Sequence, residues 1–487
     1  MLEKKQTNAI CPFCCHRFHP NEADFRLASG DSKLDTQLFN YYTDMLYYNK
    51  AAATAAATLP MAVSLETSKD AITYQEADLE KYGFVPRITF KKSSNKKETS
   101  EQRLCPNCHN NLPTGYGMRD TLLISILGDA RSGKSVFLTM LIAELENNPD
   151  FISKLTFIGD KQVRDGFYET YQKPLLKEHT LISSTKRRKI PPYAFNYWYQ
   201  YKDEAGALQE NSIDVVFYDI AGEDLRDDMA IRHNGFNIKD SSGLIFLVDP
   251  TNFSRLADLF RFSDEALIEA IPEENSNQAI FNTLYNYFLG LDREKSPIPF
   301  ALAVSKSDLF KYVNFDFFSD KPENRIQHVL EDEIHRGAVN MSSVKGIHEE
   351  VRELIAYLNE DGILNNAVGC FKHVNSFALS SLGKKPMVEK ISDPITNETV
   401  ERGYIDGQLE PFRVKDPFYW ILMRNSLMLK YENGRYALHQ EPTAETAESR
   451  HESHGLKNAL ARVFHEGQFP GAQKIAKLFA KFFPKSR

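Results

Sequence analysis

The eight residues "GDARSGKS", Gly128 to Ser135, decide how the rest of the sequence is interpreted. They fit the pattern G-x-x-x-x-G-K-[ST], follow an apolar run that predicts a strand, and precede a helical pattern that begins at Lys134. Gly128 and Gly133 would let backbone N–H groups turn inward, and the start of the helix would direct its positive end toward an anion. Lys134 would reach the outer phosphates of a nucleotide, and Ser135 would offer a hydroxyl to Mg²⁺. A glycine turn beside a surface lysine is the alternative, but the strand and helix around the stretch favour phosphate binding.

The residues expected to contact the phosphates are Gly128, Asp129, Ala130, Arg131, Ser132, Gly133, Lys134, Ser135 and Val136.

Short apolar runs alternate with helical patterns between residues 118 and 432, which predicts an α/β domain with a mostly parallel sheet flanked by helices. The expected strands are "TLLISIL" (121–127), "AFNYWYQYK" (194–202), "SIDVVFYD" (212–219), "SGLIFLVD" (242–249), "FALAVSK" (300–306) and "FKHVNSFALS" (371–380). Expected helices begin at Lys134, Phe253, Gln278 and Glu349, and "KDPFYWILMRNSLML" (415–429) is expected to be the last helix.

The stretch "VVFYDIAGED" (215–224) places Asp219 at the end of a predicted strand and Gly222 three residues later. Because the carboxyl ends of parallel strands meet at one sheet edge, Asp219 is expected beside the phosphate loop, as a ligand of Mg²⁺ directly or through water. The N–H of Gly222 would then sense the γ-phosphate. A strand followed by an Asp-containing turn is the alternative.

The stretch "ALAVSKSDL" (301–309) completes a set of motifs in the order expected of one protein class. Together, "GDARSGKS", "DIAG" and "SKSD" resemble the first, third and fourth motifs of the GTPase (TRAFAC-like) class of P-loop proteins, and "FALSSLG" (377–383) lies near the place of the fifth. The resemblance implies that Asp308 accepts hydrogen bonds from guanine and that Lys306 packs over the base. The usual fourth motif has Asn or Thr where this chain has Ser305, whose hydroxyl can still bond to the phosphate loop. Ser380, Ser381 and Leu382 would contact the base from the other side.

Hydrolysis needs further groups, and the resemblance to the GTPase class indicates where they lie. The γ-phosphate-sensing threonine, a further ligand of Mg²⁺, is expected in residues 175–192, with Thr185 as the first choice and Thr180 as the alternative. Glu223 occupies the position of a water-orienting glutamine; a solvated acid is the other interpretation. Guanylate-binding proteins and atlastins resemble this chain in having an arginine at the position of Arg131, which implies an arginine finger acting in cis. Alternatively, Arg131 faces solvent or pairs with an acid on a neighbouring loop.

Residues 1–117 contain the pairs "CPFC" and "LCPNC", which are typical of zinc-ribbon knuckles. The thiols of Cys11, Cys14, Cys105 and Cys108 are therefore expected to bind Zn²⁺. The long gap between the pairs predicts a helical insertion, supported by "KAAATAAATL" (50–59), and the lysine-rich residues 91–103 are expected to form a solvated loop. A structural staple is favoured over a surface that grips nucleic acid or protein. A redox pair and a mixed site remain open, the spare ligand types being Cys15, His16, His19 and His109.

Composition limits the class of protein further. The chain has 487 residues, 42% apolar and 26% charged, with a net charge of −7 that argues against general binding of nucleic acid. No signal peptide or run of eighteen apolar residues occurs, so a cytoplasmic protein is expected. Cys370 is interpreted as a buried apolar residue.

Residues 433–487 are expected to form a flexible linker and a basic amphipathic helix, "GAQKIAKLFAKFFPKSR" (471–487). Such a helix can lie on an anionic membrane surface as a peripheral anchor, or it can dock onto a groove of a protein.

The combined interpretation is a Mg²⁺-dependent regulatory protein that binds GTP or GDP, hydrolyses GTP, and carries a zinc ribbon. The ribbon, "DIAGED" (219–224) and "RVKDPFYWIL" (413–422) are similar to bacterial double-GTPase proteins of conflict and defence systems, which implies a protein effector or a second GTPase as partner. Two alternatives remain: a dynamin-like or guanylate-binding-like GTPase that forms homo-oligomers on membranes, and a zinc-containing ATPase that acts on nucleic acid.

Overall fold

The computed structural model describes residues 9–28, 34–43, 53–55, 59–60, 62–92, 95–117, 119–129, 131–148, 153–159, 161–182, 192–203, 207–220, 222, 225, 231, 236–253, 255–256, 276–289, 294–312, 337–392, 399–433 and 435–438.

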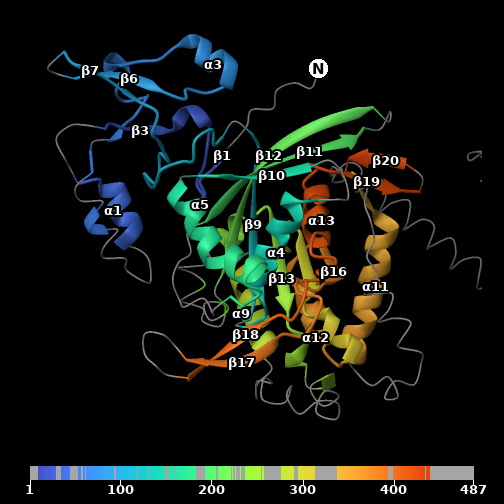
Figure 1. The fold of residues 1–487 in the computed structure, drawn as a ribbon. Helices are drawn as coiled ribbons and strands as arrows, with labels where there is room; N and C mark the ends of the chain where they lie inside the picture. The colour runs from blue at the N-terminus through green and yellow to red at the C-terminus, as the bar shows by residue number, and fades with distance from the viewer. Residues whose placement is uncertain are drawn as a thin grey trace, which may run out of the picture. The chain divides into compact units, whose positions relative to one another are not determined.

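A mixed seven-stranded sheet forms the centre of the α/β part of the molecule (Figure 1). Five strands of this sheet run parallel to one another, while β10 and β11 are antiparallel to their neighbours. In spatial order the strands are β10 (Ser153–Ile158), β11 (Tyr193–Lys202), β12 (Leu208–Asp219), β9 (Thr121–Gly128), β13 (Gly243–Val248), β14 (Phe300–Val304) and β16 (Val374–Ala378). The predicted α/β architecture with a mostly parallel sheet is confirmed. The sequence analysis did not predict β10, an edge strand that extends the sheet beyond β11.

Helices cover both faces of the sheet because its central strands are apolar on both sides. All residues of β13 and β14 are buried. Along β13, Gly243 lies against Ile421 of α13 (Asp416–Arg424), while Phe246 packs against Phe281 of α9 (Ser276–Leu289). Side chains alternate between the two faces of a strand, so α13 and α9 lie on opposite faces.

Most of the predicted helices are present. Helix α4 (Lys134–Glu146) begins at the expected residue. Helix α9 begins at Ser276, close to the expected Gln278, but α11 (Met341–Tyr357) begins two turns before the expected Glu349, because Asn340 caps it there. Helix α12 (Asp361–Cys370) follows α11. Of the pattern that begins at Phe253, the described residues 255–256 are helical.

The prediction of one helix over residues 415–429 is wrong at its end. Helix α13 ends at Arg424 because Ser426 adopts a left-handed conformation, with φ of 58°. The chain then forms β19 (Leu429–Glu432), which pairs with β15 (Ala338–Asn340) and β20 (Arg435–Leu438).

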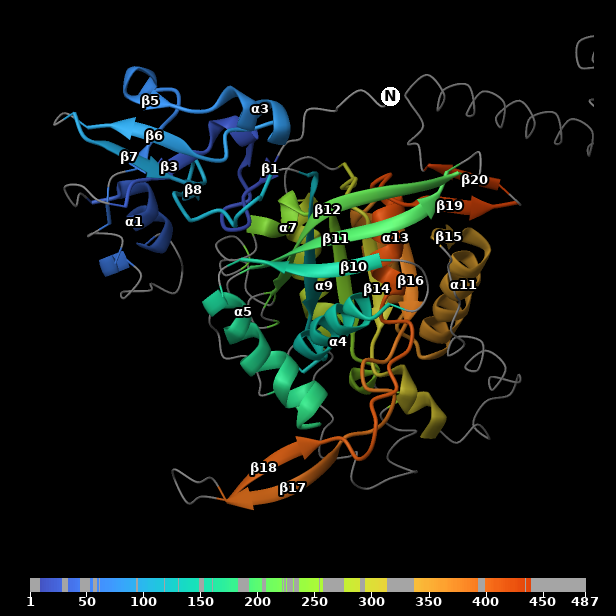
Figure 2. The ribbon, with the colours of Figure 1, turned by 45° about the horizontal axis from the view of Figure 1, so that its top comes forward.

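A hairpin that the sequence analysis did not predict follows β16 in sequence and projects away from the central sheet (Figure 2). It consists of β17 (Met387–Ser392) and β18 (Thr399–Tyr404). At its base, Leu181 N donates to Gly403 O at 2.8 Å and Ile405 N donates to His179 O at 2.7 Å. The hairpin therefore pairs with the segment that follows α5 (Lys161–Phe167) and the π-helix η3 (Tyr168–Lys177).

The N-terminal module contains two cysteine knuckles and a mixed insertion rather than the helical insertion that was predicted. The insertion includes α1 (Thr36–Thr43) and α3 (Glu76–Tyr82), and of the alanine-rich stretch residues 53–55 are described and helical. The remaining short elements of the module are β1 (Ala9–Ile10), which precedes the first knuckle, and, after that knuckle, β2 (Arg17–Phe18), η1 (Pro20–Glu22), β3 (Asp24–Arg26), β4 (Ala62–Val63), η2 (Lys69–Ala71), β5 (Ile72–Thr73), β6 (Ile88–Lys91), β7 (Lys97–Ser100) and β8 (Arg103–Leu104).

The expectation of a solvated loop at residues 91–103 is also wrong, because β6 and β7 form a hairpin there. Asn95 supplies a left-handed turn residue, with φ of 61°, and Lys92 N donates to Lys96 O across the turn. Thus the lysines of this stretch belong to an ordered antiparallel pair.

Residues of the first knuckle share one hydrophobic core with the sheet. None of the helices in the described ranges is long and apolar enough to cross a bilayer. The predicted linker from residue 433 begins too early, because residues 435–438 form β20, which pairs with β19. The rest of the linker, from residue 439, and the predicted basic helix at 471–487 lie outside the described residues.

Candidate functional site

The phosphate loop joins the end of β9 to the start of α4, and its two glycines have separate structural reasons. Gly128 has φ of +144°, and a Cβ there would lie 2.5 Å from the carbonyl oxygen of Leu247. Gly133 has φ of +88° and precedes the first helical residue. A side chain at either position would strain the loop.

The ammonium group of Lys134 lies inside this loop. Its Nζ donates to Gly128 O at 2.9 Å and to Asp129 O at 2.8 Å, and the lysine is buried. The N-terminus of α4 directs the positive end of the helix dipole to the same place, so the loop concentrates positive charge.

Two of the three predicted ligands of Mg²⁺, Ser135 and Asp219, lie together at the sheet edge. Ser135 Oγ donates to Asp219 Oδ2 at 2.6 Å, because β12 runs parallel to β9 with Asp219 opposite Ile126. Burial raises the pKa of Asp219, while the charge of Lys134 and the hydrogen bond from Ser135 act in the opposite direction. A hydroxyl and a carboxylate beside a phosphate loop are oxygen ligands of the kind that Mg²⁺ prefers.

Ser305 of the fourth motif contacts the loop between β9 and α4. Ser305 Oγ donates to Ser132 O at 3.1 Å, although it also lies 3.0 Å from Val248 O. This contact fixes the position of β14's end relative to the loop that would hold the phosphates.

The predicted base-binding residues also converge. The carboxylate of Asp308, which is buried, accepts a hydrogen bond from Ser380 Oγ, and Gly383 N donates to the same hydroxyl at 2.9 Å. Lys306 has φ of 51°, and its Nζ lies 2.5 Å from Asp249 Oδ2. Ser380 is buried, and Ser381 and Leu382 are half-buried.

Asp249 is a site residue that the sequence analysis missed. It follows the apolar strand β13 directly, as Asp219 follows the apolar part of β12, so the same strand-end signal could have found it. Its carboxylate holds the ammonium of Lys306 and accepts from Thr251 N at 3.0 Å.

Of the remaining predicted site residues, the structure describes Gly222 and Thr180. Gly222 is buried beyond the end of β12. Thr180 is buried, and its Oγ1 donates to Pro174 O at 3.2 Å at the end of the π-helix. Ala130, Thr185 and Glu223 lie outside the described residues.

Arg131 differs from the rest of the phosphate loop. It has φ of 68°, its side chain is exposed, and it makes no hydrogen bond or ion pair with any residue that the structure describes. A guanidinium at this position is therefore accessible to a group bound at the loop.

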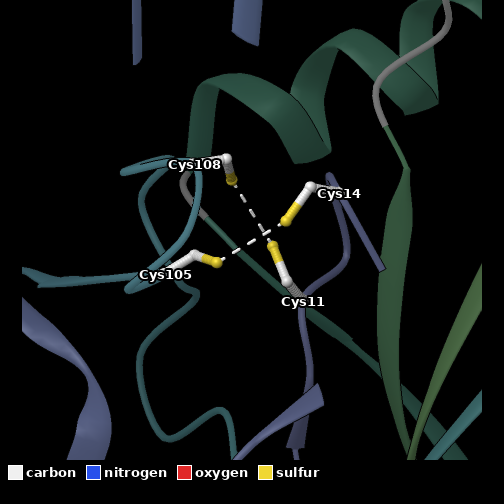
Figure 3. Close-up of side chains that lie close together, drawn as sticks. All are labelled: Cys11, Cys14, Cys105 and Cys108. Carbon is white, nitrogen blue, oxygen red and sulfur yellow. Dashed lines mark hydrogen bonds between the residues drawn. The ribbon is translucent and has the colours of Figure 1, made fainter. Parts of the chain in front are cut away.

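Four cysteines converge from two segments distant in sequence (Figure 3). Cys11 Sγ lies 3.7 Å from Cys108 Sγ, Cys14 Sγ lies 3.7 Å from Cys105 Sγ, and all four sulfurs lie within 4.8 Å of one another. A tetrahedral Zn²⁺ with Zn–S bonds of about 2.3 Å sets the sulfurs about 3.8 Å apart, so this cluster fits zinc. A disulfide needs an S–S distance of about 2.05 Å, and all six cysteines are free, so no disulfide joins these sulfurs.

The two knuckles repeat the same hydrogen bonds. The first cysteine's sulfur accepts from the amide two residues on, at 3.3 Å from Phe13 N to Cys11 and at 3.4 Å from Asn107 N to Cys105. The amides of Cys15 and His109 each close a turn at 3.0 Å, to Cys11 O and Cys105 O. Donors directed at sulfur stabilise thiolates, the form that binds metal.

The spare ligand types do not join the described cluster. Cys15 Sγ lies 3.6 Å from Tyr218 Oη, His16 stacks with Phe18, and His19 Nδ1 accepts from Asn21 N.

His109 also lies apart from the cluster, between two carboxylates. Its Nδ1 is 2.8 Å from Asp35 Oδ1 and its Nε2 is 3.0 Å from Asp24 Oδ2. Although burial lowers the pKa of His109, the two carboxylates raise it to about 9 overall. In the described residues, the candidate metal site is therefore composed of four cysteines alone.

Comparison with known proteins adds the following. No family model matches the chain. The chain is 22% identical over 334 residues to SaeC of Mycolicibacterium smegmatis, whose name describes a role in ESX-1 scaffolding and assembly; the match covers 65% of this chain and 78% of SaeC.

Two solved structures are similar at 13% identity. One is the signal recognition particle receptor SRb-GTP/SRX complex from Chaetomium thermophilum, with a TM-score of 0.24, covering 54% of this chain and 93% of that chain. The other is the Saccharomyces cerevisiae Ski7 GTPase-like domain bound to GTP, with a TM-score of 0.29, covering 65% and 52%. Because these TM-scores are low, the fold is argued from the chain itself: a mostly parallel α/β sheet with a phosphate loop at the carboxyl end of a central strand.

Proposed function

We propose that the chain is a Mg²⁺-dependent regulatory protein that binds guanine nucleotides and hydrolyses GTP. The observation that carries the proposal is the link from Asp308 to the phosphate loop. Ser305, three residues before Asp308, donates to Ser132 O at 3.1 Å, so one short segment touches both the phosphate loop and the expected base site.

Guanine is favoured over adenine by hydrogen-bond chemistry. The carboxylate of Asp308 accepts hydrogen bonds, and guanine offers two adjacent donors, N1–H and the 2-amino group. Adenine has an acceptor at N1 and no 2-amino group, so it would place a lone pair against the carboxylate and offer it no hydrogen bond.

The remaining residues have separate roles in this proposal. Lys134 and the loop amides bind the β- and γ-phosphates, and Ser135, Asp219 and Thr185 hold Mg²⁺. Gly222 contacts the γ-phosphate, and Glu223 orients the attacking water. Arg131 neutralises charge that develops during phosphoryl transfer, which its exposed position supports.

The four cysteines bind one structural Zn²⁺ in this proposal, supported by sulfur separations of 3.7 Å and by amides that donate to the sulfurs. Zinc would neutralise the thiolates and join two halves of the module that have little core of their own. The name of the relative SaeC supports a protein partner, so we propose an effector protein or a second GTPase, as in defence systems, over nucleic acid.

The test is calorimetry of GTP and ATP binding to the full chain and to Asp308→Asn. The wild type is expected to bind GTP at least about 100-fold more tightly than ATP, and the variant to lose that preference. The variant should also gain affinity for xanthosine triphosphate, because its amide can donate to the 2-oxo group, and this gain shows that the variant is folded. Lys134→Ala is the matched control, since it should weaken GTP and ATP alike. Equal binding of ATP and GTP by the wild type would contradict guanine specificity.

A further inference from the structure

Tyr218 connects the end of β12 to the first cysteine knuckle. Its hydroxyl donates to Pro12 O and lies 3.6 Å from Cys15 Sγ. Tyr218 directly precedes Asp219, so the two side chains lie on opposite faces of the sheet: Asp219 toward Ser135 and Tyr218 toward the knuckle. One strand end therefore contacts both candidate metal sites.

Three tyrosines hold consecutive parts of this knuckle. Tyr116 donates to Ile10 O, Tyr218 to Pro12 O, and Tyr41 to Phe13 O at 3.1 Å. Tyr41 belongs to α1 and Tyr116 to the link before β9, so of the three only Tyr218 lies in the strand that ends at Asp219.

The hydrogen bond of Tyr218 is costly to lose. The tyrosine is 7% exposed, and a buried phenol without a partner costs about 1–3 kcal/mol. The position of the Pro12 carbonyl therefore influences the position of the end of β12. That carbonyl lies between Cys11 and Cys14, where zinc would fix the turn.

We propose that Tyr218 is a positioning residue that couples zinc occupancy of the four cysteines to Mg²⁺ binding at Ser135 and Asp219. The inference rests on the proposed function, because it needs both zinc and Mg²⁺–GTP to bind. Zinc fixes the Cys11–Cys14 turn, the turn fixes Tyr218, and Tyr218 fixes the orientation of Asp219. Without zinc the acceptor of Tyr218 moves, and the Asp219 carboxylate is held less well for Mg²⁺.

Coupling between two binding sites is reciprocal, which gives two independent measurements. Removal of zinc should raise the Mg²⁺ concentration at half-saturation for binding a fluorescent GTP analogue by about 10-fold, within the usual range for coupled sites. Conversely, Mg²⁺–GTP should tighten zinc binding and therefore slow zinc release to a chromogenic chelator. GTP affinity without Mg²⁺ should change little.

Tyr218→Phe is the test variant and Tyr41→Phe the matched control, both in the full chain. Tyr218→Phe should retain one zinc, show a half-saturating Mg²⁺ concentration about 10-fold above wild type, and show zinc release that is insensitive to Mg²⁺–GTP. Tyr41→Phe removes the same kind of bond from the same knuckle but should behave like wild type in both measurements.

The two possible failures are distinguishable. Wild-type values of Mg²⁺ half-saturation and of zinc release in Tyr218→Phe would overturn the inference and leave the proposed function intact. A wild-type chain that binds no zinc or no GTP would instead overturn the proposed function, and the inference with it. If the zinc-depleted chain does not stay folded, zinc release measured on the loaded chain decides the question alone.

Discussion

The cysteine cluster and the phosphate loop both contain non-glycine residues with left-handed backbone conformations, but the side chains of these residues differ in their contacts with the rest of the protein. At the knuckles these residues are Cys15, with φ of 56°, and His109, with φ of 52°; both contact polar side chains of the protein. In the phosphate loop, Arg131 has φ of 68° and an exposed side chain.

A left-handed residue with a Cβ costs about 1–2 kcal/mol, so something must offset the strain. At the knuckles, contacts within the protein can do so. For Arg131, no described hydrogen bond or ion pair does so. The difference teaches that the knuckle turns are completed by the protein itself, while the conformation of Arg131 is understandable as preparation for a ligand.

The largest expected effect tests whether the four cysteines alone bind the metal and stabilise the N-terminal module. Cys105→Ser should reduce bound zinc from about one per chain to near zero and make the N-terminal module sensitive to protease, because structural zinc contributes about 10–16 kcal/mol to folding. Metal analysis and limited proteolysis measure both effects. Cys370→Ser is the control, since it removes a buried thiol of α12 outside the cluster and should keep its zinc. Full zinc in Cys105→Ser would show that four thiolates are not needed.

The second prediction tests whether Arg131 is held ready for a ligand. Arg131→Ala should lower kcat for GTP by about 10³-fold at saturating nucleotide, with zinc content unchanged, because known arginine fingers contribute at least that much. Single-turnover hydrolysis measures the effect. Arg131→Gly also removes the side chain but tolerates the left-handed backbone, so equal losses in both variants would assign the effect to the guanidinium. An unchanged kcat would remove the finger role and leave the strain at Arg131 unexplained.

The smallest expected effect concerns the buried carboxylate of Asp214, in the strand that ends at Asp219. Asp214 of β12 is fully buried, and although Arg119 and Asn196 oppose the shift, burial raises its pKa to about 6. This pKa is above the value of about 4 in an unfolded chain. The contribution of Asp214 to the free energy of unfolding is therefore greatest below pH 4 and falls as the pH rises through 6. The difference is about 3 kcal/mol at most.

Denaturant unfolding of wild type and Asp214→Asn between pH 4 and pH 8 checks this contribution. The variant removes the ionisation, so its free energy of unfolding should fall less than that of the wild type across this range. Identical pH profiles would mean that the Arg119 ion pair, at 3.2 Å, fully compensates the burial.

Sequence reasoning succeeded where structure depends on neighbours along the chain. The loop between β9 and α4 is determined by local glycines and by the apolar strand before it. The position of Asp219 follows from the rule about where parallel strands end, while Asp308 was chosen from the resemblance to the fourth motif. Ser305 is the exception, because its contact with Ser132 crosses 173 residues, and it was expected only from the resemblance of this stretch to the fourth motif of the GTPase class.

The rest depends on contacts between distant segments. Tyr218 and Pro12 are 206 residues apart, and no local pattern signals that a tyrosine on one strand will hold a cysteine turn. Likewise, β10 needs β11 as a partner, and the hairpin at β17 and β18 rests on residues 179–181. Residues 91–103 were predicted to be a solvated loop because an exposed hairpin and a solvated loop share the same lysine-rich composition.

The separation of the two knuckles has a consequence for how the chain is made. Cys14 precedes its partner Cys105 by 91 residues, so at about 5–20 residues per second the first thiol pair leaves the ribosome roughly 5–20 seconds before the second. Until then it is an incomplete chelator, open to other metals and to oxidants. Tyr218 is synthesised later still, after both knuckles. With zinc bound as proposed, translation would allow the four cysteines to close on the ion before the strand that carries Tyr218 has been made.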